Sequence, residues 1–263
     1  MKLLIGSHDG LLLWHDGAVS NLLPGRVYGI TKVNDTTWYC LHDEQLMMLT
    51  FEGDKLLHAD PILHCSRGIH QIDMVGSELV LADTRRNQLL FYSDIRAAPV
   101  AVVPNGYQRE GPPDETHLHL NSIHRHADTL YVLAHNLSVR FNRPSQVWEI
   151  DMSKHTVRDS YDIDGMACHN LYVDQTGILF LDSVGGRIMR DSAVLATLGP
   201  YLRGLSITAD RYAIGISRPD RTGGGLLILD KQFVELARYD LPSQVFEIRC
   251  FDQPDFGMSN TGH

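Results

Sequence analysis

Histidine is abundant in this chain, with 14 copies among 263 residues, and three of them lie at the beginnings of short apolar strands. His70 and His169 occupy the same place in a repeated pattern, and His119 precedes Asn121, the residue at that place in another copy, by two positions. Residues two apart on a strand project to the same side. Three imidazoles that leave one coordination position open are typical ligands of Zn²⁺ or Fe²⁺. We therefore predict that His70, His119 and His169 bind a divalent transition metal, with Glu247 as a candidate fourth ligand.

Two further side chains at the same place in the pattern have the chemistry of a catalytic site. Arg203 is suited to binding a substrate carboxylate or phosphate, and Tyr28 is suited to proton transfer or hydrogen-bond donation. Together with Glu247, these residues form the predicted catalytic set.

A second group of polar residues stands where the neighbouring strand of each repeat ends. A carboxylate beside an imidazole fixes the tautomer of a catalytic or metal-bound histidine. We expect this arrangement for His70 with Asp83 and for His169 with Asp182. The predicted substrate-binding residues are Asp83, Asn121, His135, Asp182, Ser217 and Arg218.

The elements that must position these residues are short strands, since helical periodicity is nearly absent from the sequence. The repeating unit is an apolar strand, a tight polar turn and a second apolar strand that ends in a polar residue. A third strand and an edge strand usually follow. Copies recur at intervals of about 42 residues, which is the length of a four-stranded propeller blade. They begin at Val27, Ile69, Leu120, Cys168 and Leu202.

The two ends of the chain supply one more blade. Residues 245–251 resemble a first strand with no second strand after it, and residues 3–7, 11–14 and 18–22 resemble a second, third and fourth strand. Pairing the ends removes the sheet edges that an open array of strands would expose. We predict a single all-β domain over residues 1–263, a six-bladed β-propeller whose last blade is closed by the C-terminal inner strand. A β-sandwich is the alternative, but it leaves the repeats unexplained.

The predicted site lies on the face where the first strands begin and the second strands end, at the mouth of the central channel. By strand order, the long loops 103–116, 137–145 and 218–225 belong to this face, whereas the turns at 34–37, 75–78 and 174–177 on the other face are short. Long loops on a rigid scaffold usually carry the binding residues.

Charge and composition narrow the class of partner. The formal net charge of -9, with no basic run, argues against nucleic acid and against anionic membranes. No apolar stretch approaches the roughly 18 residues of a membrane span, and the N-terminus lacks the apolar core of a signal peptide. The four cysteines lack metal-binding spacing, so we expect buried, reduced thiols and a cytoplasmic protein.

Several segments resemble an uncharacterised family of bacterial β-propellers, most closely over the last three blades. The resemblance supports the fold and the positions of the site, and it implies no activity. The chain is also loosely similar to six-bladed propellers of the NHL and gluconolactonase type; gluconolactonases bind a divalent cation at the channel mouth. The segments that carry the family resemblance are 119–121, 181–183, 203–205, 215–219 and 246–247.

These patterns predict a metal-dependent lyase, hydrolase or isomerase that acts on a small anionic molecule or a peptide end. The alternative is a non-catalytic propeller that binds a sugar or peptide at the same place. Two other interpretations of the polar residues at these positions remain open. They form either a ring of structural hydrogen bonds between neighbouring blades or a polar pocket without a metal. A protein-interaction scaffold is a third class, for which Tyr107 and Phe141 are the candidate exposed aromatic residues.

Overall fold

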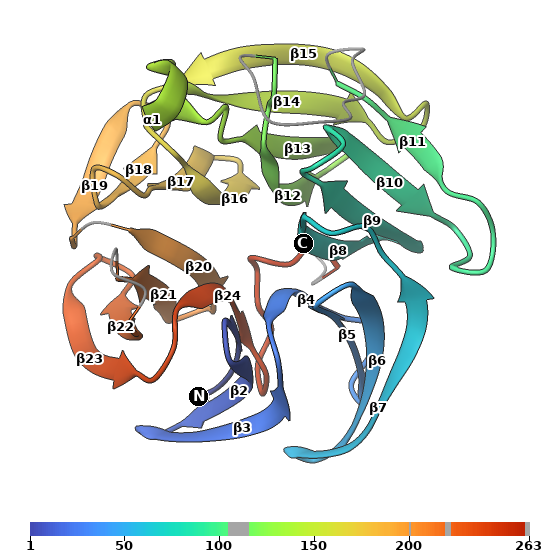
Figure 1. Ribbon diagram of the computed structural model, residues 1–263. Helices are drawn as coiled ribbons and strands as arrows, with labels where there is room; N and C mark the ends of the chain where they lie inside the picture. The colour runs from blue at the N-terminus through green and yellow to red at the C-terminus, as the bar shows by residue number, and fades with distance from the viewer. Residues whose placement is uncertain (105–115, 200, 219–221, 261–263) are drawn as a thin grey trace. The chain divides into compact units, whose positions relative to one another are not determined.

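The computed structural model describes residues 1–104, 116–199, 201–218 and 222–260. In these ranges the chain forms six four-stranded antiparallel sheets and one short helix, α1 (Ser138–Phe141). Five of the sheets consist of four consecutive strands, and the sixth combines strands from the two ends of the chain (Figure 1). The fold is thus the all-β, six-bladed β-propeller that the sequence predicts.

The strands fall into two compact units, which we call the first unit (Met1–Cys65 with Tyr201–His263) and the second unit (Ser66–Pro200). The single domain predicted for residues 1–263 stays a prediction. No helix in the described ranges is both long enough and apolar enough to cross a membrane.

The first unit contains three sheets. Two are built from consecutive strands, and the third has the order β24-β1-β2-β3. The strands are β1 (Lys2–Ser7), β2 (Gly10–His15), β3 (Ala18–Pro24), β4 (Val27–Lys32), β5 (Thr37–His42), β6 (Gln45–Glu52), β7 (Lys55–His64), β20 (Leu202–Ile207), β21 (Arg211–Ser217), β22 (Gly224–Asp230), β23 (Glu235–Leu241) and β24 (Val245–Cys250).

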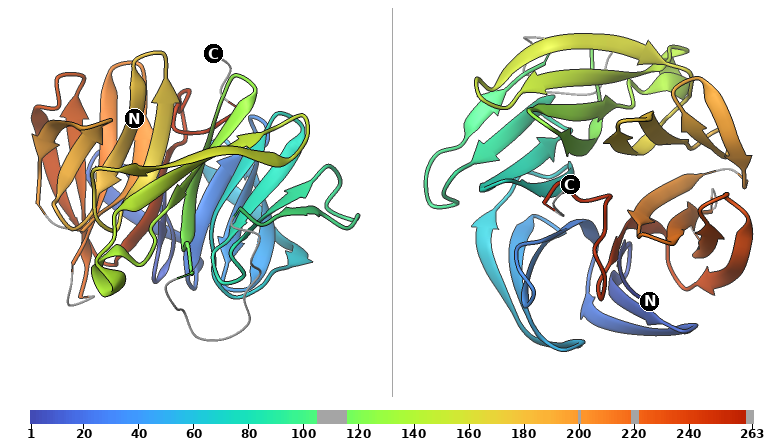
Figure 2. Two further views of the ribbon diagram at one scale, coloured as in Figure 1. Left: turned by 90° about the horizontal axis from the view of Figure 1, so that it is seen from above. Right: turned by 180° about the vertical axis from the view of Figure 1, so that it is seen from behind.

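The sheet that joins the two ends of the chain confirms the predicted closure. Strand β24 pairs antiparallel with β1, with Ile5 opposite Ile248 and Gly6 opposite Glu247. Figure 2 shows these C-terminal residues in red beside the N-terminal strands in blue. The segment after β24 is anchored by the buried carboxylate of Asp255, which accepts hydrogen bonds from Oγ of Ser206 and from the backbone N–H groups of Ile207, Cys250 and Gly257.

The second unit contains three sheets of consecutive strands. They are β8 (Ile69–Val75), β9 (Glu78–Asp83), β10 (Gln88–Tyr92) and β11 (Val100–Val102); β12 (Leu120–His126), β13 (Thr129–Ala134), β14 (Ser145–Asp151) and β15 (Thr156–Ile163); and β16 (His169–Asp174), β17 (Gly177–Asp182), β18 (Arg187–Arg190) and β19 (Ala193–Thr197).

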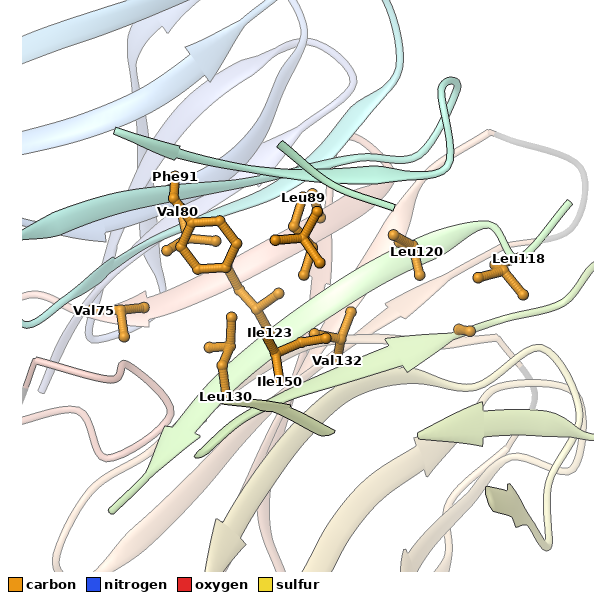
Figure 3. Packing of buried hydrophobic residues seen from close by; sticks show 13 residues of the cluster. Val75, Val80, Leu89, Phe91, Leu118, Leu120, Ile123, Leu130, Val132 and Ile150 are labelled. Carbon is orange, nitrogen blue, oxygen red and sulfur yellow. The ribbon is translucent and has the colours of Figure 1, made fainter. Parts of the chain in front are cut away.

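The hydrophobic core lies between neighbouring sheets. Inner strands have apolar contacts on both faces, which explains apolar runs such as those of β9 and β17, whereas the outer strand β15 is largely exposed. Each fully buried leucine contributes about 1.5–3 kcal/mol to stability. Figure 3 shows how one sheet of the second unit packs against the next, through Val80, Leu89 and Phe91 on one side and Ile123, Leu130, Val132 and Ile150 on the other.

Candidate functional site

The first strand of every sheet contains a β-bulge close to the predicted site position. Its pairing with the second strand shifts register near the same end in all six sheets. Bulges re-aim side chains and are common beside functional sites. The residues left outside the pairing are His70, Asn121 and Asn170 in the second unit, and Tyr28 with Gly29, Arg203 with Gly204, and Phe246 in the first.

The strand pairing confirms that the two predicted rings of residues share one end of each sheet. Ile69 is opposite Asp83, and Val27 is opposite His42. The unpaired residue of the bulge differs between two of the strands: it is His70 in β8 and Asn170 in β16, where His169 is paired with Leu181. His70 and His169 nevertheless hold equivalent positions in their strands. Each stands two residues before a buried residue, Ile72 or Leu171, that pairs with Leu81 or Phe180 of the second strand.

The second unit brings the predicted histidines together in what we call the histidine cluster: His70, His117, His119, His135 and His169. The ring centroid of His119 lies 4.8 Å from that of His70, 4.7 Å from that of His135 and 5.7 Å from that of His117. The ring centroids of His135 and His169 are 5.4 Å apart. Sequence reasoning had missed His117. Its signal was present, because His117 precedes His119 by two residues, as His119 precedes Asn121.

The rings of the histidine cluster pack mainly edge to face, with interplanar angles of 76° for His70 with His119 and 79° for His135 with His169. Burial, followed by the electrostatic effect of the neighbouring histidines, lowers the pKa of His119 well below its ordinary value. The His119 ring is therefore neutral at neutral pH. Within the described residues, no group of three His, Cys, Asp or Glu side chains is arranged to hold a metal ion.

His169 has a defined tautomer. Its Nδ1 donates a hydrogen bond to the carbonyl oxygen of Ala167 at 2.8 Å and lies 2.9 Å from Oγ of Ser183. A proton on Nδ1 leaves the lone pair on Nε2. This is the second-sphere contact that commonly orients a histidine for metal binding.

The two carboxylates expected beside histidines bind other groups. Asp182 forms an ion pair with Arg187, with 2.6 Å between Nη2 and Oδ2, and accepts hydrogen bonds from the N–H groups of Met166 and Gly185. Both Asp182 and Asp83 are buried.

Asp83 accepts hydrogen bonds from Nε2 of Gln88 and from the N–H of Arg86. The contacts seen for the two aspartates thus stabilise the turns that follow β9 and β17.

Three of the other predicted binding residues also have structural contacts. Nδ2 of the buried Asn121 donates to the carbonyl oxygen of Cys168 at 2.8 Å. Oγ of Ser217 donates to the carbonyl oxygen of Val245 at 2.8 Å, and Arg218 forms an exposed ion pair with Asp240. His135 belongs to the histidine cluster, and its backbone N–H donates a hydrogen bond to the carbonyl oxygen of His119.

The first unit brings together the predicted residues Tyr28 and Arg203 with Phe246, and we call this group the arginine–aromatic site. The rings of Tyr28 and Phe246 are stacked, 4.4 Å apart at an angle of 13°. The guanidinium carbon of Arg203 lies 4.8 Å from the Phe246 centroid and 5.9 Å from that of Tyr28. Among the described residues, Arg203 has neither a hydrogen-bond nor an ion-pair partner.

The electrostatic environment of Arg203 combines opposing effects. Burial lowers the pKa of its guanidinium from the ordinary value, while Tyr28 and Glu247 act in the opposite direction. An arginine nevertheless stays protonated in proteins. Gly204, which follows it, has φ +86°, and a Cβ there would lie only 3.0 Å from Cγ1 of Ile248. This glycine lets the bulged backbone of β20 approach β24 closely.

Glu247, the third predicted catalytic residue, is part of a buried ion pair. Its Oε2 lies 3.3 Å from Nη2 of Arg249, and the two side chains are 3% and 1% exposed, respectively. Arg249 also donates to the carbonyl oxygens of Ile30 and Leu205. The contacts of Glu247 are thus those of a structural ion pair.

The long loops predicted over the site are described only in part. Residues 105–115, with Tyr107, and residues 219–221 lie outside the described ranges. The loop at 137–145 contains α1, and the guanidinium carbons of Arg140 and Arg143 lie 5.1 Å and 5.6 Å from the centroid of the Phe141 ring. Arg143 ties this loop to the backbone of the histidine cluster by donating to the carbonyl oxygen of His117.

The cysteines are four free, buried thiols, as predicted. Burial raises the pKa of Cys40, Cys168 and Cys250 to about 12. These three side chains are therefore protonated thiols at neutral pH and do not act as nucleophiles.

Comparison with known proteins supports the fold. No protein-family description matches the sequence, and no curated protein matches it. Among solved structures, one titled as a nidogen/laminin complex matches with a TM-score of 0.70 and 11% identity, over 94% of this chain and 97% of that one. A protein of unknown function from Bacteroides caccae matches with a TM-score of 0.64 and 10% identity, also over 94% and 97%.

The WD40 domain of Neurospora crassa Pan2 matches with a TM-score of 0.55 and 12% identity, over 86% of this chain and 69% of that one. At these identities the similarities show the fold alone, a β-propeller. The resemblance to NHL and gluconolactonase propellers stays a prediction.

Proposed function

We propose that this protein is a ligand-binding propeller that takes a small anionic molecule against Arg203. The observation that carries the proposal is the position of the guanidinium, which lies beside the rings of Phe246 and Tyr28 without an acceptor among the described residues. A half-buried charge without a partner is costly, and a bound carboxylate or phosphate would remove this cost. Contacts with aromatic rings occupy none of the guanidinium N–H groups as hydrogen-bond donors to oxygen, so these groups stay available for such a ligand.

Two further features support a site at this place. The β-bulges in the three first strands of the first unit leave Tyr28, Arg203 and Phe246 outside the regular pairing, and bulges are common beside functional sites. The net charge of -9 disfavours polyanions such as nucleic acid while leaving a local arginine site for a small anion. A cytoplasmic location remains our proposal and is supported by the four free thiols.

The test is isothermal titration of the protein at pH 8 with phenyl phosphate and with its singly charged ester, methyl phenyl phosphate. We expect at least one of them to bind, and Arg203→Gln to weaken that binding by about 10- to 100-fold, because charge-assisted hydrogen bonds are lost. Arg238→Gln is the matched control, since Arg238 pairs with Glu235 on the outer strand β23. Binding that survives Arg203→Gln, or no binding of either anion, would refute the proposal.

A second candidate function is the metal-dependent lyase, hydrolase or isomerase, with Zn²⁺ or Fe²⁺ in the histidine cluster. Four imidazole rings pack against one another in the order His70, His119, His135 and His169, which favours this function. The tautomer of His169 also favours it, because the lone pair on Nε2 is available for a metal. The neutral state of His119 is the form that a metal requires. A bound metal would supply Lewis-acid chemistry after the rings had reoriented.

Elemental analysis of protein purified anaerobically without chelators tests this candidate. We expect about one equivalent of zinc or iron in the wild type and its loss in His119→Asn. A wild type without stoichiometric metal, or metal that persists after loss of both His70 and His169, would exclude the predicted ligand set.

A further inference from the structure

We infer that the anion bound at Arg203 is a dianion whose charge lies on oxygen atoms, such as a phosphate monoester. The inference rests on the proposed function and names the class of its ligand. It comes from Arg26, a second arginine at the arginine–aromatic site that the sequence patterns had not singled out.

Arg26 and Arg203 lie over the same aromatic ring. The guanidinium carbon of Arg26 is 5.6 Å from the centroid of Tyr28, and that of Arg203 is 5.9 Å from it. Arg26 immediately precedes β4, and Arg203 is the second residue of β20. Guanidinium groups from two separate sheets of the first unit therefore both lie within 6 Å of the Tyr28 ring, which we call the platform.

Arg26 is incompletely paired. Its Nε is buried and has no hydrogen-bond partner in the part of the chain that the structure describes. Its ion pair with Asp43 is long, with 3.8 Å between Nη2 and Oδ1, and the Asp43 side chain is 51% exposed. A contact of this length at the surface contributes little and is not a direct hydrogen bond.

The carboxylates near the platform do not satisfy the hydrogen-bond donors of the two guanidinium groups. Glu247 is the second carboxylate in the neighbourhood, and it forms the buried ion pair with Arg249. The exposed Asp43 thus faces Arg26, while Arg203 has no ion-pair partner among the described residues. Arginine binds phosphate oxygens through two parallel N–H groups. A ligand with two negative charges can accept hydrogen bonds from both guanidinium groups, whereas a single charge satisfies Arg203 alone.

The test compares phenyl phosphate with methyl phenyl phosphate by titration calorimetry at pH 8. The second pKa of a phosphate monoester is about 6, so the first compound carries two charges at this pH and the second carries one. We expect the wild type to bind the dianion at least about 10-fold more tightly. Arg26→Gln should remove this preference and leave the affinity for the monoanion within about twofold.

Asp43→Asn should increase the affinity for the dianion, whereas Arg26→Gln should decrease it. It removes the carboxylate that competes for Arg26, so the affinity for phenyl phosphate should rise by about twofold, as expected for a weak surface pair. Arg238→Gln is again the control and should change neither affinity. Thermal unfolding of each variant confirms that it is folded.

The possible failures are distinguishable. If neither compound binds, or binding survives Arg203→Gln, the proposed function itself is wrong. If both compounds bind with similar affinity and both depend on Arg203, the proposed function stands and the dianion inference is overturned. A preference for the dianion that persists in Arg26→Gln, or a loss of affinity in Asp43→Asn, also overturns it.

Discussion

Replacement of Arg249 tests whether Glu247 has a structural role. The Arg249 guanidinium is buried beside Glu247, with 3.3 Å between Nη2 and Oε2, and donates to the carbonyl oxygens of Ile30 and Leu205. Arg249→Met leaves the carboxylate buried without its counterion and removes a donor from both carbonyl groups. Breaking a buried pair in this way costs about 3–5 kcal/mol of unfolding free energy. For a chain of this size, that corresponds to roughly 6–15 °C in Tm.

The matched variant is the double replacement Arg249→Met with Glu247→Leu. It removes both charges, and apolar substitutes for a buried ion pair are often neutral in stability. We expect the double variant to recover most of the loss, leaving about 1–2 kcal/mol for the two carbonyl groups without donors.

Urea unfolding monitored by tryptophan fluorescence measures the free energies, and calorimetry with phenyl phosphate measures ligand binding. A double variant that is less stable than Arg249→Met would refute this account of the ion pair. The double variant should also keep the Arg203-dependent binding; complete loss of binding in a folded double variant would show that Glu247 has a direct role in the site.

Three further predictions concern stability. Asp255→Asn should cost about 2–4 kcal/mol in urea unfolding, because the amide replaces one of the two oxygens that together accept four hydrogen bonds and removes the charge; a neutral effect would show that the ionised carboxylate is not needed to hold the segment after β24. Gly204→Ala should cost about 2 kcal/mol more than Gly53→Ala in the same assay. Both glycines have positive φ, but a Cβ at Gly53 meets nothing within 4 Å, so equal losses would argue against close packing at Gly204. Hydrogen bonds, chiefly from Ser153, hold the pKa of Asp151 well below its usual range. Its ionised form therefore stabilises the fold above the unfolded pKa of about 3.9, and this contribution disappears as the pH falls through the lower folded value. The stability difference between wild type and Asp151→Asn should shrink between about pH 6 and about pH 2, and a constant difference would contradict this assignment.

The fold was predictable because each blade repeats the same strand–turn–strand pattern. The inner strands are apolar on both faces, so runs such as residues 79–82 and 178–181 mark them directly. The closing blade could be predicted because β24 has the pattern of a first strand without a following second strand.

The candidate site was predictable in position and less so in contacts. His70, His119 and His169 do cluster, but the place of the bulge in β16 and the participation of His117 depend on bulges and loops that alternation does not encode. The ion pair of Glu247 with Arg249 had a signal, since residues two apart lie on the same side of a strand. The positions of Asp83 and Asp182 were predicted, but their contacts with turn residues could not be read from spacing.

The pairing of β1 with β24 also has a consequence for biosynthesis. The ribosome makes β1 long before its partner β24, which is complete only at Cys250. At about 5–20 residues per second, roughly ten to fifty seconds separate the two strands. Throughout that interval the nascent chain exposes an unsatisfied sheet edge, which is a template for association with other chains. The yield of native protein therefore depends on how rapidly the codons between β1 and β24 are translated and on whether a chaperone shields β1 in the meantime.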